Sequence, residues 1–175
     1  EGIDRMLRYI EADAQRAREA LTEIYRNRTH PEHGRQELIW TINGEETIRS
    51  RLVEITAGTE HSLDIVSSYA FLGHTLPALL PKIRENVTLR IITDHWEGKL
   101  PEGAELYLLP PLDHIHSVHR KLEETAGVFI IDQTSALVLM GGEFISPTAL
   151  YSESQGFVNF FIRYWDFIEK ISKKS

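Results

Sequence analysis

Residues 127–142 have the sequence GVFIIDQTSALVLMGG. The runs GVFIID and SALVLM are both strongly apolar, and Gln133 and Thr134 lie between them. Two apolar runs joined by so short a polar segment predict a β-hairpin with a tight turn at these two residues. The hairpin places at least one antiparallel pair of strands in whatever sheet the chain forms.

The residues on both sides of the hairpin alternate between strand and helix patterns. Strands are expected at residues 37–42, 61–67, 87–93, 104–109 and 148–152. Helices are expected at residues 45–57, 76–86, 114–124 and 155–173, although Pro81 should kink or restart the second of them. Strands that alternate with helices predict an α/β domain with a mixed, largely parallel sheet flanked by helices.

The first thirty residues carry a heptad pattern. Their apolar positions are spaced four and three residues apart: Ile3, Leu7, Ile10, Ala14, Ala17, Leu21 and Ile24. So narrow a seam between charged residues predicts a long coiled-coil helix that pairs two copies as a homodimer. The alternative is an amphipathic helix that lies on its own domain. We therefore expect a dimerising helix over 1–28, a polar linker over 29–36 and a globular domain over 37–175.

Composition excludes several classes of protein. The chain has 175 residues, 42% hydrophobic residues and a net charge of −7, so it should fold as one domain and bind nucleic acid poorly by itself. It contains no cysteine, which excludes disulfides and thiolate metal sites. No apolar run approaches the length of a membrane span, and no signal peptide is present. We expect a cytoplasmic protein and, since the chain begins at Glu1, a fragment of a longer one.

The order of these elements resembles a known family. The segments that carry the resemblance are HSLDIVSS, VTLRIIT, GVFIIDQTSALVLMGG and, most closely, ALYSESQGFVNFFIRYWDFIEK, all after the seam helix. Together they resemble the effector-sensing part of TrmB-type transcriptional regulators, which are known from archaea and often described as sugar-responsive. In that family a winged-helix DNA-binding domain precedes the dimerising helix, and a phospholipase-D-like domain follows it. The resemblance implies that DNA is bound only through a winged helix that these residues do not include.

A phospholipase-D-like fold raises the question of catalysis. Enzymes of that class use an H-x-K-x-x-x-x-D motif, in which the His is the nucleophile and the Lys binds phosphate. If Asp132 takes the Asp position, Thr125 takes the His position and Gly127 the Lys position. Neither residue can perform that chemistry. His119 and Lys121 also have the H-x-K spacing, but no Asp follows at the required distance. We therefore expect no enzymatic activity and no cofactor.

A histidine cluster follows two prolines. His114, His116 and His119 have the spacing H-x-H-x-x-H, and Asp113 precedes them. On a helix Asp113, His116 and His119 share one face, and this set of donors suits zinc. The alternative is a solvated segment in which Asp113 caps a helix. We expect no metal, with these residues as the only candidates.

A small ligand should bind outside the carboxyl ends of the strands. The polar residues predicted there are Ser67, Ser68, Asp94, His95, Trp96, Asp132 and Gln133. A charge, a hydrogen-bonding ring and an aromatic plane suit a sugar or another polar ring. The alternatives are that Trp96 covers the edge of the core and that Ser67 and Ser68 cap the following turn.

These expectations give one main function and two alternatives. The main function is an effector-sensing and dimerisation domain whose ligand, a sugar or a similar molecule, changes the spacing of the two coiled-coil helices and of the DNA-binding domains attached to them. The first alternative is a degenerate phospholipase-D-like or metal-dependent hydrolase. The second is a dimeric scaffold that binds no ligand.

Overall fold

The computed structural model describes residues 2–27, 38–110, 127–141 and 147–175. Its helices are α1 (Gly2–Asn27), α2 (Glu45–Ala57), α3 (Tyr69–Leu79), the 3₁₀ turn η1 (Leu80–Lys82) and α5 (Gln155–Ile171). Its strands are β1 (Ile39–Asn43), β2 (Ser62–Val66), β3 (Thr88–Thr93), β4 (Glu105–Leu108), β5 (Gly127–Ile131), β6 (Ser135–Met140), β7 (Thr148–Ser152) and β8 (Lys173–Lys174).

All eight strands belong to one sheet, in the order β1-β7-β6-β5-β2-β3-β4-β8. Only the pairs β2–β3 and β3–β4 are parallel, and the other five pairs are antiparallel. The mixed sheet is confirmed, but the prediction that it is largely parallel is wrong. Short turns can join only antiparallel neighbours, and β5 and β6 are such a pair.

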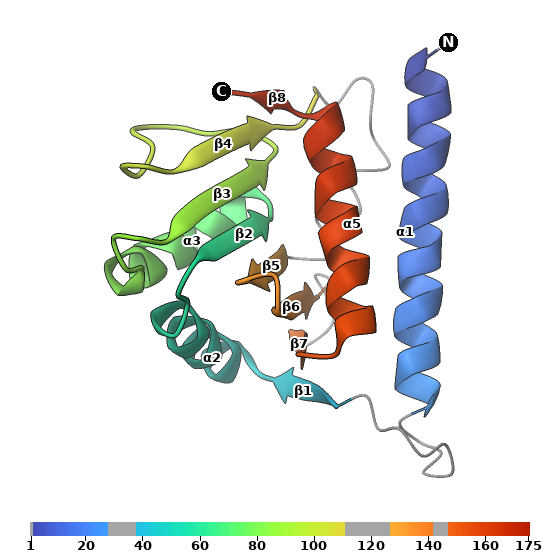
Figure 1. Ribbon diagram of the computed structural model, residues 1–175, viewed down its shortest axis with the longest axis horizontal. Helices are drawn as coiled ribbons and strands as arrows, with labels where there is room; N and C mark the ends of the chain where they lie inside the picture. The colour runs from blue at the N-terminus through green and yellow to red at the C-terminus, as the bar shows by residue number, and fades with distance from the viewer. Residues whose placement is uncertain (1, 28–37, 111–126, 142–146) are drawn as a thin grey trace.

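Helices cover both faces of the sheet. α5 lies on one face and α2 and α3 lie on the other (Figure 1). The cluster under α5 includes Val66, Ile92, Val128, Ile130, Phe161 and Trp165. The cluster under α2 and α3 includes Leu52, Ile65, Leu72, Ile91, Phe129 and Leu137. Residues 65 and 66, like 91 and 92, alternate between the two clusters, as the two-residue period of a strand requires.

The N-terminal helix exists as predicted, but pairing with a second copy is not shown. α1 runs beside α5, so that α5 lies between the sheet and α1 (Figure 1). Leu21 is 9% exposed and belongs to the same apolar cluster as the inner face of α5. Ala14 and Ala17 are half-buried, whereas Arg8 and Arg16 are exposed. At Leu21 the seam therefore packs on its own chain. The side chains of Ile3, Leu7, Ile10 and Ile24 lie outside the described part.

Two local predictions need correction. The helix expected at 76–86 instead spans Tyr69–Leu79, with Pro77 inside it, and Pro81 falls in the 3₁₀ turn that follows. The hairpin turn is centred one residue earlier than predicted, because Asp132 and Gln133 both have positive φ, 53° and 59°. The Thr134 amide donates to the Ile131 carbonyl at 3.0 Å, which closes this turn.

Some expectations fall outside the described residues. The helix predicted over 114–124 and the whole linker predicted over 29–36 are among them. Within the described part, no helix is both long and apolar enough to cross a membrane.

Candidate functional site

The carboxyl ends of β2 and β3 meet at one edge of the sheet, because these two strands are parallel. Ser67 and Ser68 follow β2, and Asp94 follows β3. The Ser68 hydroxyl accepts a hydrogen bond from the Phe71 amide at 3.3 Å and caps α3. Ser67 is fully buried beside Gly127. Ser68 therefore has the capping role that was the alternative to ligand contact, and Asp94 is left as the polar centre of this edge.

Asp94 collects three hydrogen bonds. Its Oδ1 accepts from the Tyr69 amide at 2.7 Å and from the Thr93 hydroxyl at 3.0 Å, while its Oδ2 lies 2.8 Å from Nδ1 of His95. Burial by itself would raise the pKa of Asp94. The bonds from Tyr69, His95 and Thr93 outweigh burial and lower that pKa. Asp94 is therefore a firmly ionised carboxylate that orients the imidazole of His95.

An aromatic group completes the cluster. The ring of Tyr69 lies 4.6 Å from the His95 ring and 5.5 Å from the Trp96 ring, between centroids. The Tyr69 hydroxyl donates to the Glu97 carbonyl at 3.3 Å. Trp96 packs on the cluster under α2 and α3, and its Nε1 is buried with no hydrogen-bond partner among the described residues. The Tyr69 ring thus lies against the rings of both His95 and Trp96.

The chemistry available here follows from the hydrogen bonds. A carboxylate only accepts, so Nδ1 of His95 carries a hydrogen and donates it in the hydrogen bond to Asp94. The second ring nitrogen, Nε2, can then accept a hydrogen bond. The His95 side chain is 53% exposed. His95 can therefore offer a polar ligand one exposed hydrogen-bonding nitrogen, beside the ring of Tyr69.

Asp132 and Gln133 lie elsewhere. β5 is antiparallel to β2, so its carboxyl end is at the opposite edge of the sheet from Asp94. The expectation that all the strand ends form one site is therefore wrong for this pair. It assumed a parallel sheet, in which every carboxyl end would face the same edge. The candidate ligand residues fall into two groups on opposite edges.

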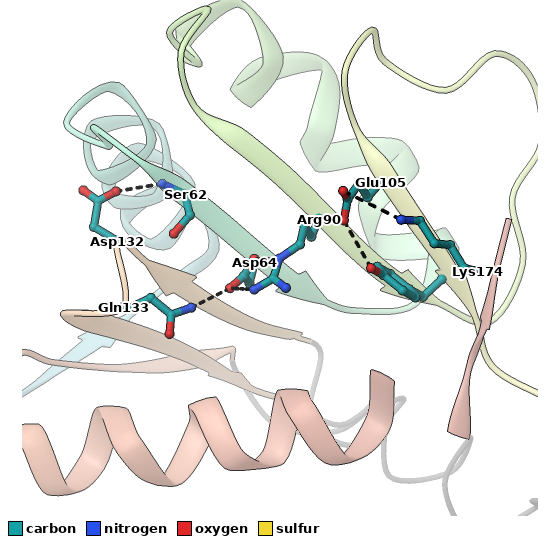
Figure 2. Close-up of polar contacts among 8 residues, drawn as sticks. Ser62, Asp64, Arg90, Glu105, Asp132, Gln133 and Lys174 are labelled. Carbon is teal, nitrogen blue, oxygen red and sulfur yellow. Dashed lines mark hydrogen bonds and ion pairs between the residues drawn. The ribbon is translucent and has the colours of Figure 1, made fainter. Parts of the chain in front are cut away.

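The Asp132 carboxylate is committed to the main chain. It accepts hydrogen bonds from the amides of Glu60 at 3.0 Å, His61 at 2.6 Å and Ser62 at 2.9 Å. Burial would raise the pKa of Asp132, but these bonds outweigh it and lower the pKa. Figure 2 shows the bond to Ser62. Asp132 therefore ties the hairpin turn to the start of β2 and has little capacity left for a ligand.

Gln133 takes part in a buried polar group that the sequence analysis missed. Its Nε2 donates to Oδ2 of Asp64 at 3.0 Å, and Arg90 binds both Asp64 oxygens at 2.7 Å (Figure 2). The Arg90 guanidinium lies 4.0 Å from the centre of the Trp165 ring on α5. Asp64 and Arg90 are the single charged residues within strands β2 and β3. That pattern of opposite charges was a usable signal for a buried ion pair.

The hydrolase motif can be tested at Gly127. A side chain there would place its Cβ 3.1 Å from Oγ of Ser67 and 3.1 Å from Cε2 of Phe129. Such contacts are tighter than real Cβ atoms normally make. The site has no room for a lysine unless these neighbours move. Thr125, at the nucleophile position, lies outside the described residues.

The metal candidates cannot be placed in the same way. Asp113, His116 and His119 all lie within residues 111–126, outside the described part. Among the described residues, no cluster of three or more His, Asp or Glu residues could hold a metal ion.

No protein-family model matches the chain, and no curated protein sequence matches it. Several solved structures do match the chain. TrmBL2, described as an archaeal chromatin protein with a novel mode of DNA binding, has a TM-score of 0.60 and 15% identity over 98% of this chain. NucT from Helicobacter pylori has a TM-score of 0.54 and 10% identity over 79% of this chain and 99% of its own. Nuc from Salmonella typhimurium, a phospholipase D family member, has a TM-score of 0.52 and 10% identity over 79% and 97%.

Identities this low show a shared fold only. The domain is phospholipase-D-like, and the chain spans 66% of the length of TrmBL2. The likeness to TrmBL2 goes further along the chain than the likeness to the two nucleases. α1 makes up 26 of 175 residues, so a match over 98% of the chain includes it. A match over 79% leaves out about a fifth of the chain.

Proposed function

We propose that this chain is the sensing and dimerisation part of a TrmB-like transcriptional regulator. One observation carries the proposal: the likeness to TrmBL2 includes the long N-terminal helix as well as the phospholipase-D-like domain. TrmBL2 is described as binding DNA. The present residues have a net charge of −7, which opposes contact with phosphates. DNA binding is therefore assigned to a domain outside these 175 residues.

The proposal includes the absence of catalysis. The two nucleases share the fold, but the lysine position of the motif falls on Gly127, which has no charged side chain, and a side chain there would lie only 3.1 Å from Ser67 and Phe129. Asp132, at the third position of the motif, uses its carboxylate to hold main-chain amides. A phosphate bound at the position of the motif would therefore contact neither a histidine nucleophile nor a lysine. We expect no release of nitrophenol from bis(p-nitrophenyl) phosphate.

The effector is assigned to the edge that carries Tyr69, Asp94, His95 and Trp96. Asp94 already accepts three hydrogen bonds, so its role is to fix the imidazole of His95. His95 Nε2 is the group left for a ligand, because the His95 side chain is 53% exposed, whereas Trp96 Nε1 is buried. A ring nitrogen beside the aromatic ring of Tyr69 suits a hydroxyl group and the flat apolar face of a sugar or another polar ring.

Dimerisation is assigned to the first heptads of α1. Leu21 packs against α5 in its own chain, so the partner contact falls to the seam positions Ile3, Leu7 and Ile10. An effector that binds one arrangement of the dimer better than the other shifts the population toward it. Effector binding then changes the spacing of the two α1 helices and, with it, the spacing of the DNA-binding domains attached to them.

Thermal shift tests the sensing part. The 175-residue chain is screened against sugars, sugar phosphates and nucleotides, together with His95→Ala and the matched control His61→Ala, an exposed histidine at the opposite edge. A ligand at about 100 times its Kd adds about 2.7 kcal/mol, which moves Tm by roughly 5–10 °C. We expect one class of compound to raise Tm in the parent and in His61→Ala but not in His95→Ala. A shift that His95→Ala retains would contradict this site.

A second candidate is a dimeric scaffold without an effector. It is favoured by the fact that the Asp94 carboxylate is satisfied by groups of its own chain. In that case no compound raises Tm, while the dimer persists.

A further inference from the structure

We propose a second, separate ligand site in the hollow between α2, α3 and β6, and assign it to a small carboxylate with an apolar body. The hollow has a volume of about 490 Å³. That volume lies within the range of about 300–1,000 Å³ that small-molecule sites occupy. It contains none of the residues of the Asp94 cluster, so the inference does not rest on the proposed sensing function.

The floor of the hollow is apolar. It is formed by Ile48 and Leu52 from α2, Phe71 from α3 and Leu139 from β6. Ile48, Leu52 and Leu139 are almost fully buried in the cluster under the two helices, and Phe71 is half-buried. An apolar ring or a branched chain placed on this floor would cover the exposed part of Phe71. Removing that apolar surface from water is favourable.

The rim carries two basic groups from two different helices. Arg49 is on α2 and His74 is on α3, and both line the hollow. His74 is exposed and has no side-chain partner among the described residues. The Thr75 hydroxyl, from α3, adds a group that can donate or accept a hydrogen bond. The rim also carries the Glu45 carboxylate, which pairs with Arg49, so a ligand carboxylate would replace Glu45 at Arg49 and give His74 a partner.

The present partner of Arg49 is easily exchanged. Its Nη2 lies 3.3 Å from Oε1 of Glu45, and the Glu45 side chain is 77% exposed. An exposed pair of this kind within a helix contributes little to stability. An anion held over the apolar floor is less solvated, and its hydrogen bonds to a guanidinium are stronger. The proposed ligand is therefore a carboxylate that exchanges with Glu45 at Arg49, because Glu45 and Arg49 both line the hollow and their pair is exposed.

The chain contains a matched control for this claim. Arg51 is also on α2 and also forms an exposed ion pair within the helix, with Glu54 at 3.2 Å. It does not line the hollow. Arg49→Gln and Arg51→Gln therefore make the same change in net charge, and only the first alters the proposed site; Arg51→Gln also loses the contact of Arg51 with the Tyr151 ring, 5.5 Å from its centre.

The test uses phenylacetate, its neutral analogue phenylacetamide, and nuclear magnetic resonance of the ¹⁵N-labelled chain. Phenylacetate should shift the amide signals of Leu52, Phe71 and Leu139. We expect Arg49→Gln and His74→Gln each to weaken phenylacetate binding roughly tenfold, the loss of one charge-assisted hydrogen bond. Arg51→Gln and His95→Ala should leave it unchanged, and phenylacetamide should bind roughly tenfold more weakly to the parent.

Three results would overturn the site. One is no shift at these amides when phenylacetate is present at about 10 mM, since a ligand with a Kd near 1 mM would then be largely bound. Another is an equal loss of affinity in Arg49→Gln and Arg51→Gln, which would indicate general charge attraction. The third is shifts at the amides around His95 instead of those around the hollow. Arg49, His74 and His95 are exposed, Arg51 is half-buried, and none of them belongs to either apolar cluster, so each variant should fold.

Discussion

Arg90 contacts both carboxylate oxygens of Asp64 at 2.7 Å, from the neighbouring position on the parallel strand. Asp64 is 1% exposed, and the guanidinium of Arg90 also lies on the ring of Trp165. The pair of charges joins β2 and β3 (Figure 2), and the contact with Trp165 links it to α5. α5 is in turn the element beside which α1 runs (Figure 1).

Arg90→Leu should therefore be strongly destabilising. It leaves the Asp64 carboxylate buried with Gln133 as its remaining side-chain donor. Breaking a buried pair in this way costs about 3–5 kcal/mol. The double variant Asp64→Leu/Arg90→Leu removes both charges and should recover most of that loss. Urea unfolding measures both. A double variant as unstable as the single one would show that packing of the Arg90 side chain, not its charge, is what matters.

The pKa of Asp132 predicts a dependence of stability on pH. Because its folded-state pKa is lowered, Asp132 stabilises the fold above the unfolded-state pKa, near 3.9. This contribution is lost as pH falls through the folded-state value. At pH 7, Asp132→Asn should lower the free energy of unfolding by about 1–3 kcal/mol, the usual range for hydrogen bonds to a charged group. Below the folded-state pKa the two proteins should converge.

Asp166→Asn is the matched control, because Asp166 is an exposed aspartate on α5. Its stability should follow that of the parent at every pH. A constant difference between Asp132→Asn and the parent across the whole pH range would contradict the ionic role of Asp132.

The hairpin turn allows strain and hydrogen bonding to be separated at Gln133. Its positive φ favours glycine, and its side chain donates to Asp64. Gln133→Ala loses the hydrogen bond and keeps the strain. Gln133→Gly loses the bond but relieves the strain. We expect the glycine variant to be more stable than the alanine variant by about 1 kcal/mol, measured by urea unfolding. Equal stabilities would mean that the left-handed backbone costs nothing here.

The seam of α1 predicts the effect of a single charge. Leu7→Glu places a carboxylate at a seam position, where it would be buried between two helices, and should weaken dimerisation at least tenfold. Arg8→Glu is the control, because Arg8 is exposed on α1. Sedimentation equilibrium gives both dissociation constants. If the two variants dissociate equally, general repulsion rather than the seam controls assembly.

Several parts of this account could be predicted from sequence. Period-two and heptad patterns are local, so α1, the hairpin and most strands were found. The relative direction of neighbouring strands could not be predicted in this way, because it depends on contacts between segments that are distant in the sequence. Asp132 was therefore placed beside Asp94, although β5 runs antiparallel to β2. The helix expected at 76–86 begins earlier, at Tyr69, because the Ser68 hydroxyl caps it there.

Local sequence patterns also could not predict which distant residues a given side chain contacts. Leu21 has the same spacing whether it faces a second copy or α5, so its place in the core could not be decided from the heptads. Arg49 and Arg51 look alike in sequence, and only the packing of α2 on α3 places one of them on the hollow. The ion pair of Asp64 and Arg90 could have been predicted, because each is the single charged residue in an apolar strand.

The proposed function rests on α1 acting as a dimerising helix, and the mass of the chain in solution tests this most directly. Light scattering on the 175-residue chain at micromolar concentration should give twice the chain mass of 20.1 kDa. A mass of 20.1 kDa would contradict it. α1 would then be a helix that packs only on its own domain, and the dimeric sensor proposed here would be wrong.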